Sequence, residues 1–426
     1  MLFSRSVGGC VLLSFLLLAF IYGVMSDSSL RNRALELMKK YPLIDGHNDL
    51  ALRLRILHNN QLSKVNLHTI KDVATDINRL IAGHVGGEMF AAYVMCTAQG
   101  KDAVRLTLEQ IDLLRRMCTE SPEMELITTA EGLNNTKRIG CLLSVEGGHS
   151  IDSSLPTLRM LYQLGVRSMA LTHSCNTPWA ESSSKYYLDY RRENNSLTEF
   201  GKAVVSEMNR LGMIIDLSHS SWATAKATMD HSRAPVIFSH SSAYKICNHT
   251  RNVPDDLLLQ LKKNKGLIMV NFHDKFIVCH GQASVSTVAD HFDHFRHVVG
   301  AEMIGIGGDF DGAVGFPQGL EDVSHYPALI QELLRRGWTE EELAAVLRLN
   351  FIRVFKEVEK VRDSLRDTPP SEVEIPFAEA NNSCRLILRP PGIATVGGVH
   401  ARNCQRGLVT VNALIWTILL VCGSLS

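Results

Sequence analysis

The chain has 426 residues, 45% of them hydrophobic, and its 44 lysines and arginines balance 44 aspartates and glutamates. This length and composition are those of a globular protein with one large α/β domain or two ordinary ones. The lack of a basic excess argues against a nucleic-acid partner.

The first segment of the chain has the pattern of a targeting signal. Arg5 precedes an apolar stretch over residues 11–24, and short residues follow up to Ser26. About 14 apolar residues are too few to span a bilayer comfortably. We therefore expect residues 1–26 to be a cleaved secretory signal peptide rather than a retained membrane anchor.

Short apolar runs alternate with amphipathic segments through residues 27–366, and this alternation predicts the fold. The runs expected to form strands cover residues 43–46, 90–95, 141–145, 168–172, 213–217, 235–239, 267–271 and 303–307. Helical periodicity appears at residues 102–117, 155–164, 199–211, 222–229, 255–263, 288–299, 326–336 and 339–358. Eight strands with helices between them predict a (β/α)8 barrel, although a doubly wound open sheet would give a similar pattern.

Histidine, aspartate or glutamate follows six of the eight apolar runs. The motifs are IDGHND, LSVEGGHS, ALTHSC, IDLSHS, IFSHSS and GIGGDFDG. In a barrel, the carboxyl ends of all strands lie on one face around one pocket. Six such strand ends favour the barrel over the open sheet and predict a shared site on that face.

Five of these residues have the spacing of metal ligands. His47 and Asp49 are two positions apart on an extended segment, so both can reach one ion. His219 and His240 follow consecutive strands, which lie only about 5 Å apart in a sheet, and can hold a second ion. Glu146 is the natural bridge, because its two oxygens can each bind one metal. Mixed histidine and carboxylate ligands suit catalytic zinc, with manganese or cobalt as alternatives.

Two such ions predict a hydrolase, because they make hydroxide from a bridging water near neutral pH and polarise a carbonyl beside it. Asp309 could take the proton of this water and pass it to a leaving amine, and His173 could donate to the oxyanion. Asp311 has the pattern of a turn or cap residue. His149 and Asp45 are expected to be capping or supporting groups, and Asp45 could orient the first metal ligand.

The C-terminal end carries a second targeting pattern. After a segment over residues 367–397, small residues at 392–398 precede a polar spacer and an apolar tail over residues 408–422. This order predicts a GPI-anchor signal over residues 398–426, with the attachment residue between 392 and 398. A short transmembrane helix is the alternative, but no positively charged cytoplasmic flank follows the tail.

The cysteine count fits an exported chain. Of ten cysteines, Cys10 leaves with the signal, and Cys404 and Cys422 leave with the tail. The remaining seven are an odd number, so one thiol stays free or pairs with another chain. Cys384, in a polar C-terminal segment, is the candidate for an interchain bridge, whereas Cys118 and Cys141 have apolar neighbours and are expected to be buried thiols.

Glycosylation sequons also indicate the secretory route. They occur at Asn134, Asn194, Asn248 and Asn381. With the two terminal signals, they predict passage through the ER to the outer face of the plasma membrane.

Several long motifs, in order, resemble one enzyme family. IDGHNDL, VEGGHSIDSSL, LTHSCNTPWAE, IDLSHSS, APVIFSHSSAY, RNVPDD and GIGGDFDG are similar to the membrane dipeptidase (renal dipeptidase) family over residues 34–358, especially the paralogues linked to leukotriene D4 hydrolysis. The resemblance implies a metal-dependent hydrolase barrel with two zinc ions, one held by His47, Asp49 and Glu146. Glu146, His219 and His240 would hold the other.

The resemblance also implies roles for residues outside the ligand set. Asp309 would be the acid and base, His173 would lie beside the substrate, and Arg251 would bind the free carboxylate of a dipeptide. Disulfides would join Cys96 to Cys175 and Cys247 to Cys279. Cys384 would form the interchain bridge of a GPI-tethered homodimer. Phe276 stands where the renal form is expected to have a tyrosine, which affects substrate preference rather than the metal site.

The leading hypothesis is a cell-surface zinc dipeptidase acting on cysteinyl-glycine type dipeptides, cystinyl-bis-glycine and leukotriene D4. Two other classes are considered. An amidohydrolase of cyclic amides would not require Arg251 and often has a lysine-derived bridge in place of Glu146. A GPI-anchored adhesion or receptor protein on a silenced barrel would not need an intact ligand set.

Overall fold

The computed structural model describes residues 27–184, 189–190 and 196–380. The predicted signal peptide and GPI-anchor signal, Cys384, Asn194 and Asn381 lie outside these ranges. Within them, every helix is too short or too polar to cross a membrane.

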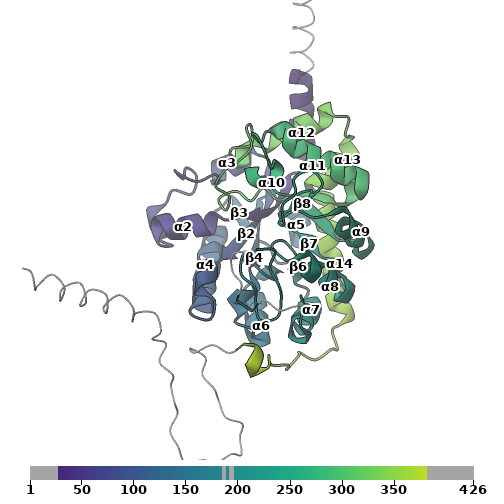
Figure 1. Ribbon diagram of the computed structural model, residues 1–426. Helices are drawn as coiled ribbons and strands as arrows, with labels where there is room; N and C mark the ends of the chain where they lie inside the picture. The colour runs from purple at the N-terminus through teal and green to yellow at the C-terminus, as the bar shows by residue number, and fades with distance from the viewer. Residues whose placement is uncertain (1–26, 185–188, 191–195, 381–426) are drawn as a thin grey trace, which may run out of the picture.

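Parallel strands form one sheet that closes on itself (Figure 1). The ring runs β1, β9, β8, β7, β6, β5, β4, β2 and back to β1, so the predicted eight-stranded barrel is confirmed. The strands are β1 (Leu43–Asn48), β2 (Val85–Tyr93), β3 (Met124–Leu126), β4 (Ile139–Glu146), β5 (Val166–Ala170), β6 (Ile214–Asp216), β7 (Ile237–Phe238), β8 (Leu267–Val270) and β9 (Ile304–Ile306). The sequence pattern missed β3, a three-residue strand beside the start of β4, because it is too short to show a period.

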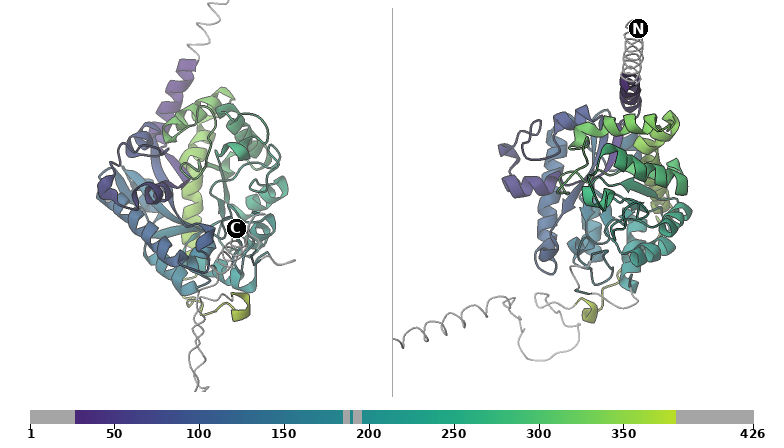
Figure 2. Two further views of the ribbon diagram at one scale, coloured as in Figure 1. Left: turned by 60° about the vertical axis from the view of Figure 1, so that its left-hand side comes forward. Right: turned by 45° about the horizontal axis from the view of Figure 1, so that its top comes forward.

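Helices surround the barrel on its outside (Figures 1 and 2). After a helix over residues 27–40, they are α2 (Leu50–His58), α3 (Ile77–Ala82), α4 (Ala103–Glu120), α5 (Ala130–Asn135), α6 (Leu155–Gln163), α7 (Glu199–Leu211), α8 (Trp222–His231), α9 (Asp255–Asn264), α10 (Asp274–Ile277), α11 (Val285–Val298), α12 (Tyr326–Arg335), α13 (Glu340–Ala344) and α14 (Asn350–Ser364). The single helix expected over residues 339–358 is wrong in detail, because a π-helical turn, Ala345–Leu349, separates α13 from α14. Arg348 in this turn is buried and donates to the carbonyl oxygens of Pro42 and Leu133.

Local capping signals set several helix ends. The Thr198 hydroxyl accepts the Gly201 N–H at the start of α7, and Gly212 ends that helix in the left-handed conformation (φ 77°). Ser284 and Thr287 form a capping box at the start of α11. Each bond satisfies a backbone group that the helix itself leaves unpaired.

Strand residues alternate between two hydrophobic clusters. The larger lies between strands and helices and contains Leu43 and Phe90. The smaller contains Ile44 and Met89, and Phe355 of α14 packs against it. Because successive strand side chains point to opposite faces, the smaller cluster is the barrel interior.

Three disulfides join the described cysteines. The structure pairs Cys96 with Cys175 and Cys247 with Cys279, as the resemblance implied. The expectation that Cys118 and Cys141 are buried thiols was wrong, because packing of α4 on β4 brings their Cα atoms to 6.1 Å and the two are bonded. The three bonds account for six of the seven cysteines and leave Cys384.

Candidate metal centre

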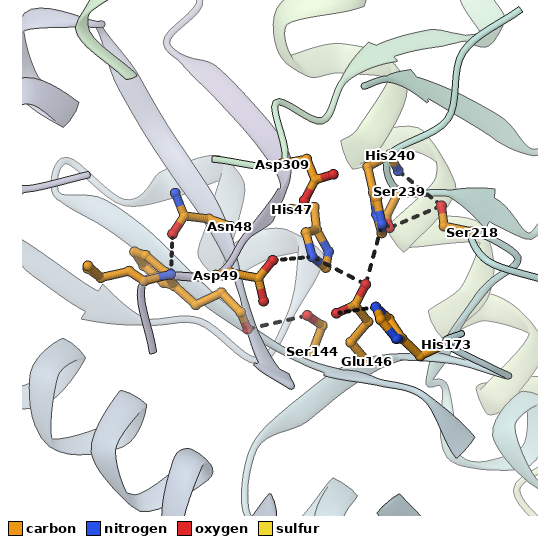
Figure 3. A network of polar contacts seen from close by, with 12 residues as sticks. His47, Asn48, Asp49, Ser144, Glu146, His173, Ser218, Ser239, His240 and Asp309 are labelled. Carbon is orange, nitrogen blue, oxygen red and sulfur yellow. Dashed lines mark hydrogen bonds and ion pairs between the residues drawn. The ribbon is translucent and has the colours of Figure 1, made fainter. Parts of the chain in front are cut away.

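The predicted site residues converge at the carboxyl ends of the barrel strands (Figure 3). This arrangement follows from the topology, since parallel strands end on the same face. His47 lies in β1 and Glu146 is the last residue of β4. The others stand just beyond their strands: Asp49 after β1, His173 after β5, His219 after β6, His240 after β7 and Asp309 after β9.

Glu146 is at the centre of the group. Its Oε1 atom lies 3.6 Å from His47 Nε2, 3.1 Å from His219 Nε2 and 3.4 Å from His240 Nε2. Its Oε2 atom lies 3.8 Å from His173 Nε2. The side chain of Glu146 is only 4% exposed, so these contacts form away from solvent. One carboxylate therefore touches imidazoles from four strand ends.

A β-bulge in β1 aims His47 into this group. Between Asp45 and Asn48, β1 advances three residues while its partner β2 advances two. Gly46 faces Met269 in the barrel interior, and His47 faces the site, so two consecutive residues point inward. An unbroken extended strand would place Asp45 and His47 on one side, and the bulge separates them.

The carboxylate of Asp49 does not cap a helix and is placed to bind a cation or a ligand. Asp49 stands at the N-cap of α2, yet its carboxylate makes no capping bond there. Its Oδ2 atom lies 3.1 Å from His47 Nε2. Its Oδ1 atom is buried and has no hydrogen-bond partner among the described residues. A buried carboxylate oxygen without a donor is costly unless a cation or a ligand satisfies it.

Two site residues adopt strained backbone conformations. His219 has φ 69° and Asp309 has φ 60°, a region that residues other than glycine rarely occupy. Such strain is found mainly at functional sites, where the surrounding structure holds it. Here it turns both side chains toward the group around Glu146.

The electrostatics of the site favour a positive charge next to His47. Burial alone would lower the pKa of His47, but the carboxylates of Glu146 and Asp49 outweigh it and raise that pKa to about 10. Burial, together with the neighbouring carboxylates of Asp49 and Asp309, also raises the pKa of Glu146 well above its ordinary value, because negative charge is crowded there. These carboxylates therefore attract a cation, and a divalent metal can replace the proton of His47.

The other imidazoles stay neutral. Burial holds the pKa of His173, His219 and His240 well below the usual histidine range. A neutral imidazole keeps one nitrogen lone pair for a metal or an N–H for a substrate oxygen. His240 is already oriented, because its Nδ1 atom lies 2.7 Å from the Ser239 hydroxyl.

At this site, three groups of side chains have ligand atoms close enough together to hold an ion. They are His47, Glu146 and His240; Glu146, His173 and His219; and His47, Asp49 and Asp309. All five ligands that the sequence predicted belong to these groups, together with His173 and Asp309. Glu146 belongs to two of these groups. The histidine and carboxylate donors gathered here therefore fit a metal centre.

Asp309 is held in place by a residue that the sequence analysis missed. Asn271, just beyond β8, donates from Nδ2 to Asp309 Oδ2 at 2.9 Å. Burial raises the pKa of Asp309, which suits a group that exchanges a proton. Asn271 is a neutral amide at the end of its apolar run, so a search for histidines and acids after the strands did not select it.

Asp216 is a second supporting residue that the analysis missed. It ends β6, and its Oδ1 atom accepts the N–H groups of Ser218 (2.9 Å) and Ser239 (3.0 Å). The Ser218 hydroxyl in turn accepts the His240 N–H at 3.0 Å. These bonds tie the ends of β6 and β7 together. The signal was present in IDLSHS, where an acid ends an apolar run.

Arg251 approaches the site from the loop after β7. Its Nη2 atom donates to the His240 carbonyl oxygen at 3.4 Å, and Phe276 packs 5.4 Å from its guanidinium carbon. The Nε atom is buried without a hydrogen-bond partner among the described residues. Phe276 itself contacts the rings of His249 and His273. The Arg251 guanidinium is thus held in place, and its Nε–H group remains available to donate to a ligand.

Three residues were expected to have supporting roles: Asp311, His149 and Asp45. None of them belongs to the groups of possible metal ligands around Glu146. Asp311 accepts the Ala74 N–H at 2.7 Å, a contact with a segment far away in the sequence. His149 Nε2 bonds with the Val94 carbonyl oxygen at 2.7 Å. Asp45 binds the His47 N–H and Tyr326.

Comparison with known proteins identifies the family. The family model "Membrane dipeptidase (Peptidase family M19)" matches residues 31–369. Dipeptidase 3 of Mus musculus is 54% identical over 365 residues, which cover 86% of this chain and 74% of that protein. Dipeptidase 3 of Homo sapiens is 52% identical over 368 residues, with coverage of 86% and 75%.

A solved structure of a metallo peptidase supports the same family. A metallo peptidase from Rhodobacter sphaeroides, crystallised with a phosphinate mimic of the dipeptide L-Ala-D-Ala, is 25% identical with a TM-score of 0.68. The match covers 74% of this chain and 99% of that one. With its barrel and its metal-ligating groups, the chain belongs to the membrane dipeptidase family, peptidase family M19, and is a hydrolase of the dipeptidase class.

Proposed function

We propose that this protein is a zinc dipeptidase with two metal ions per chain. The observation that carries the proposal is the contact of Glu146 Oε1 with the Nε2 atoms of three histidines within 3.6 Å. A carboxylate in this position can bridge two ions, with His47 and Asp49 on one side and His219 and His240 on the other. Histidine and carboxylate ligands of this kind suit catalytic zinc.

The chain's own residues would then complete the reaction. When bound, the two cations would make a water molecule a stronger nucleophile and polarise the scissile carbonyl. Asp309 accepts the proton of the attacking water and passes it to the leaving amine. His173, held neutral by burial, donates an N–H to the developing oxyanion. Arg251 binds the free carboxylate and thereby selects dipeptides.

The substrates we propose are cysteinyl-glycine type dipeptides, cystinyl-bis-glycine and leukotriene D4. All present a peptide bond one residue from a free carboxylate, which Arg251 would recognise. Support for this choice is the resemblance of motifs such as RNVPDD to dipeptidases. Turnover of the metal-loaded protein on these compounds and on a β-lactam ranks them, and an absence of cleavage of any dipeptide contradicts the proposal.

Removal of metal is expected to abolish the activity. A chelator that strips the protein should reduce dipeptide hydrolysis to background, because the attacking water is then no longer activated. Zinc should restore activity, with full recovery at two ions per chain. Metal content by elemental analysis, measured beside activity during the titration, checks both points. Full activity at one ion per chain would contradict the two-metal arrangement.

We also propose that the protein is a disulfide-linked homodimer tethered by GPI to the outer face of the plasma membrane. Cys384 is the cysteine left after the three intrachain bonds. Asn134 and Asn248 are exposed, as glycosylation requires, and a glycosidase-sensitive mass would show their use.

Substitution of Cys384 tests the interchain bond. The variant Cys384→Ser should migrate as a monomer on a non-reducing gel, whereas the wild type should migrate as a dimer that reductant dissociates. Release of the protein from cells by a phosphatidylinositol-specific phospholipase would support the GPI tether. A wild-type monomer on the non-reducing gel would contradict the bridge.

A further inference from the structure

Two carboxyl groups lie buried together behind the metal centre. Asp45 of β1 and Glu88 of β2 are register partners on neighbouring strands, and both are fully buried. Ile44 and Met89, which adjoin them in sequence, belong to the barrel interior. Because side chains alternate along a strand, Asp45 and Glu88 face the layer between strands and helices.

Asp45 receives hydrogen bonds from three directions. Its Oδ1 atom accepts the N–H of His47 at 3.2 Å and the N–H of Gly308 at 2.9 Å. Its Oδ2 atom accepts the hydroxyl of Tyr326, the first residue of α12. Three donors and no acceptor stabilise the charged carboxylate. Asp45 therefore joins the β1 bulge to the segment that leads from β9 to Asp309.

Glu88 has the opposite surroundings. Neither of its oxygens receives a hydrogen bond from an N–H or O–H group of the described residues. It lies within hydrogen-bonding reach of the Asp45 carboxyl, and burial together with Asp45 raises the pKa of Glu88 well above its ordinary value. Two adjacent carboxylates cannot both be charged in a dry interior. Since Asp45 has the donors, the proton belongs to Glu88.

A cation does not explain this pair. Among the described residues, the groups whose ligand atoms lie close enough to hold an ion do not include Glu88. Asp311 also lies on this side, but its carboxylate accepts the Ala74 N–H. A proton between Glu88 and Asp45 therefore gives a partner to one Glu88 oxygen that otherwise has none among the described residues.

We propose that Glu88 is a positioning residue that, as the neutral acid, donates a hydrogen bond to Asp45 and so holds the β1 bulge that aims His47 at the metal. The chain of contacts runs from Glu88 to the Asp45 carboxylate, and from there to the His47 N–H inside the bulge. The inference rests on the proposed function for its catalytic effect, but the shared proton does not depend on that function.

Two uncharged substitutions of Glu88, one with a hydrogen-bond donor and one without, test whether hydrogen-bond donation is its role. Glu88→Gln keeps the shape and supplies an N–H donor, so zinc affinity and kcat/KM should stay within about threefold of the wild type. Glu88→Met is similar in length but has no donor, so zinc affinity and kcat/KM should each fall about tenfold, the usual effect of losing a group that orients a ligand. Circular dichroism and chemical unfolding show whether each variant is folded.

Infrared spectroscopy detects the proton directly. A neutral carboxylic acid and a carboxylate absorb at different frequencies, so the wild type minus Glu88→Gln difference spectrum at pH 7 should contain the acid band. Glu207→Gln is the matched control, because Glu207 is also buried but pairs with Arg159 (3.0 Å) and Arg210 (2.8 Å). Its difference spectrum should contain only a carboxylate band.

The results distinguish this proposal from the proposed function. The proposal is overturned if the acid band is missing, or if Glu88→Gln weakens zinc binding as much as Glu88→Met. A wild type that binds zinc and shows the acid band but cleaves no dipeptide contradicts the proposed function and leaves Glu88 in its positioning role, provided that zinc affinity separates the two variants.

Discussion

The substitution Glu146→Gln is expected to lower kcat/KM for dipeptides on the order of 1,000-fold, equivalent to about 4 kcal/mol of transition-state stabilisation. An amide keeps the shape of Glu146 but loses the negative charge, and only its oxygen can act as a ligand. The three imidazoles around Oε1 would then share no anionic bridge. Initial rates with a saturating and a limiting dipeptide concentration, beside zinc content per chain, measure the effect.

The control for this experiment is Glu120→Gln. Glu120 is exposed at the end of α4, so the same loss of charge should leave both rate and zinc content unchanged. The two-metal proposal predicts that Glu146→Gln binds fewer than two zinc ions per chain or binds them more weakly. Wild-type turnover in Glu146→Gln would show that the bridge is not part of the mechanism.

The substitution Arg251→Met is expected to raise KM for dipeptides about 100-fold with a smaller change in kcat. A charge-assisted contact with a carboxylate stabilises by about 3 kcal/mol, and methionine keeps the packing against Phe276 without the charge. Arg251→Lys should recover only part of the loss, because an ammonium cannot form the paired contact of a guanidinium. Steady-state kinetics on one dipeptide compare the three proteins.

A dipeptide whose C-terminal carboxylate is replaced by an amide tests whether Arg251 binds that carboxylate. The wild type should prefer a dipeptide with a free carboxylate over the same dipeptide as its C-terminal amide, and Arg251→Met should lose most of that preference. Arg233→Met, at an exposed position, should retain it. An unchanged preference in Arg251→Met would assign the carboxylate to another residue and remove the reason for selecting dipeptides.

The barrel and the residues of its site were predictable from the sequence because both depend on local patterns. Buried parallel strands are short apolar runs, and a barrel places the residue after each run on one face. His47, Glu146, His219 and His240 could therefore be chosen without coordinates. Their contact through one oxygen of Glu146 is a result of the fold.

The sequence alone determined the fold class, the face that carries the site and the residue types gathered there. Only the tertiary structure decided how these residues are held. The β1 bulge, the Cys118–Cys141 bond and the pairing of Glu88 with Asp45 join segments far apart in sequence or depend on register. Periodicity reports which face of an element is buried, whereas the partner across a buried face depends on how strands and helices pack.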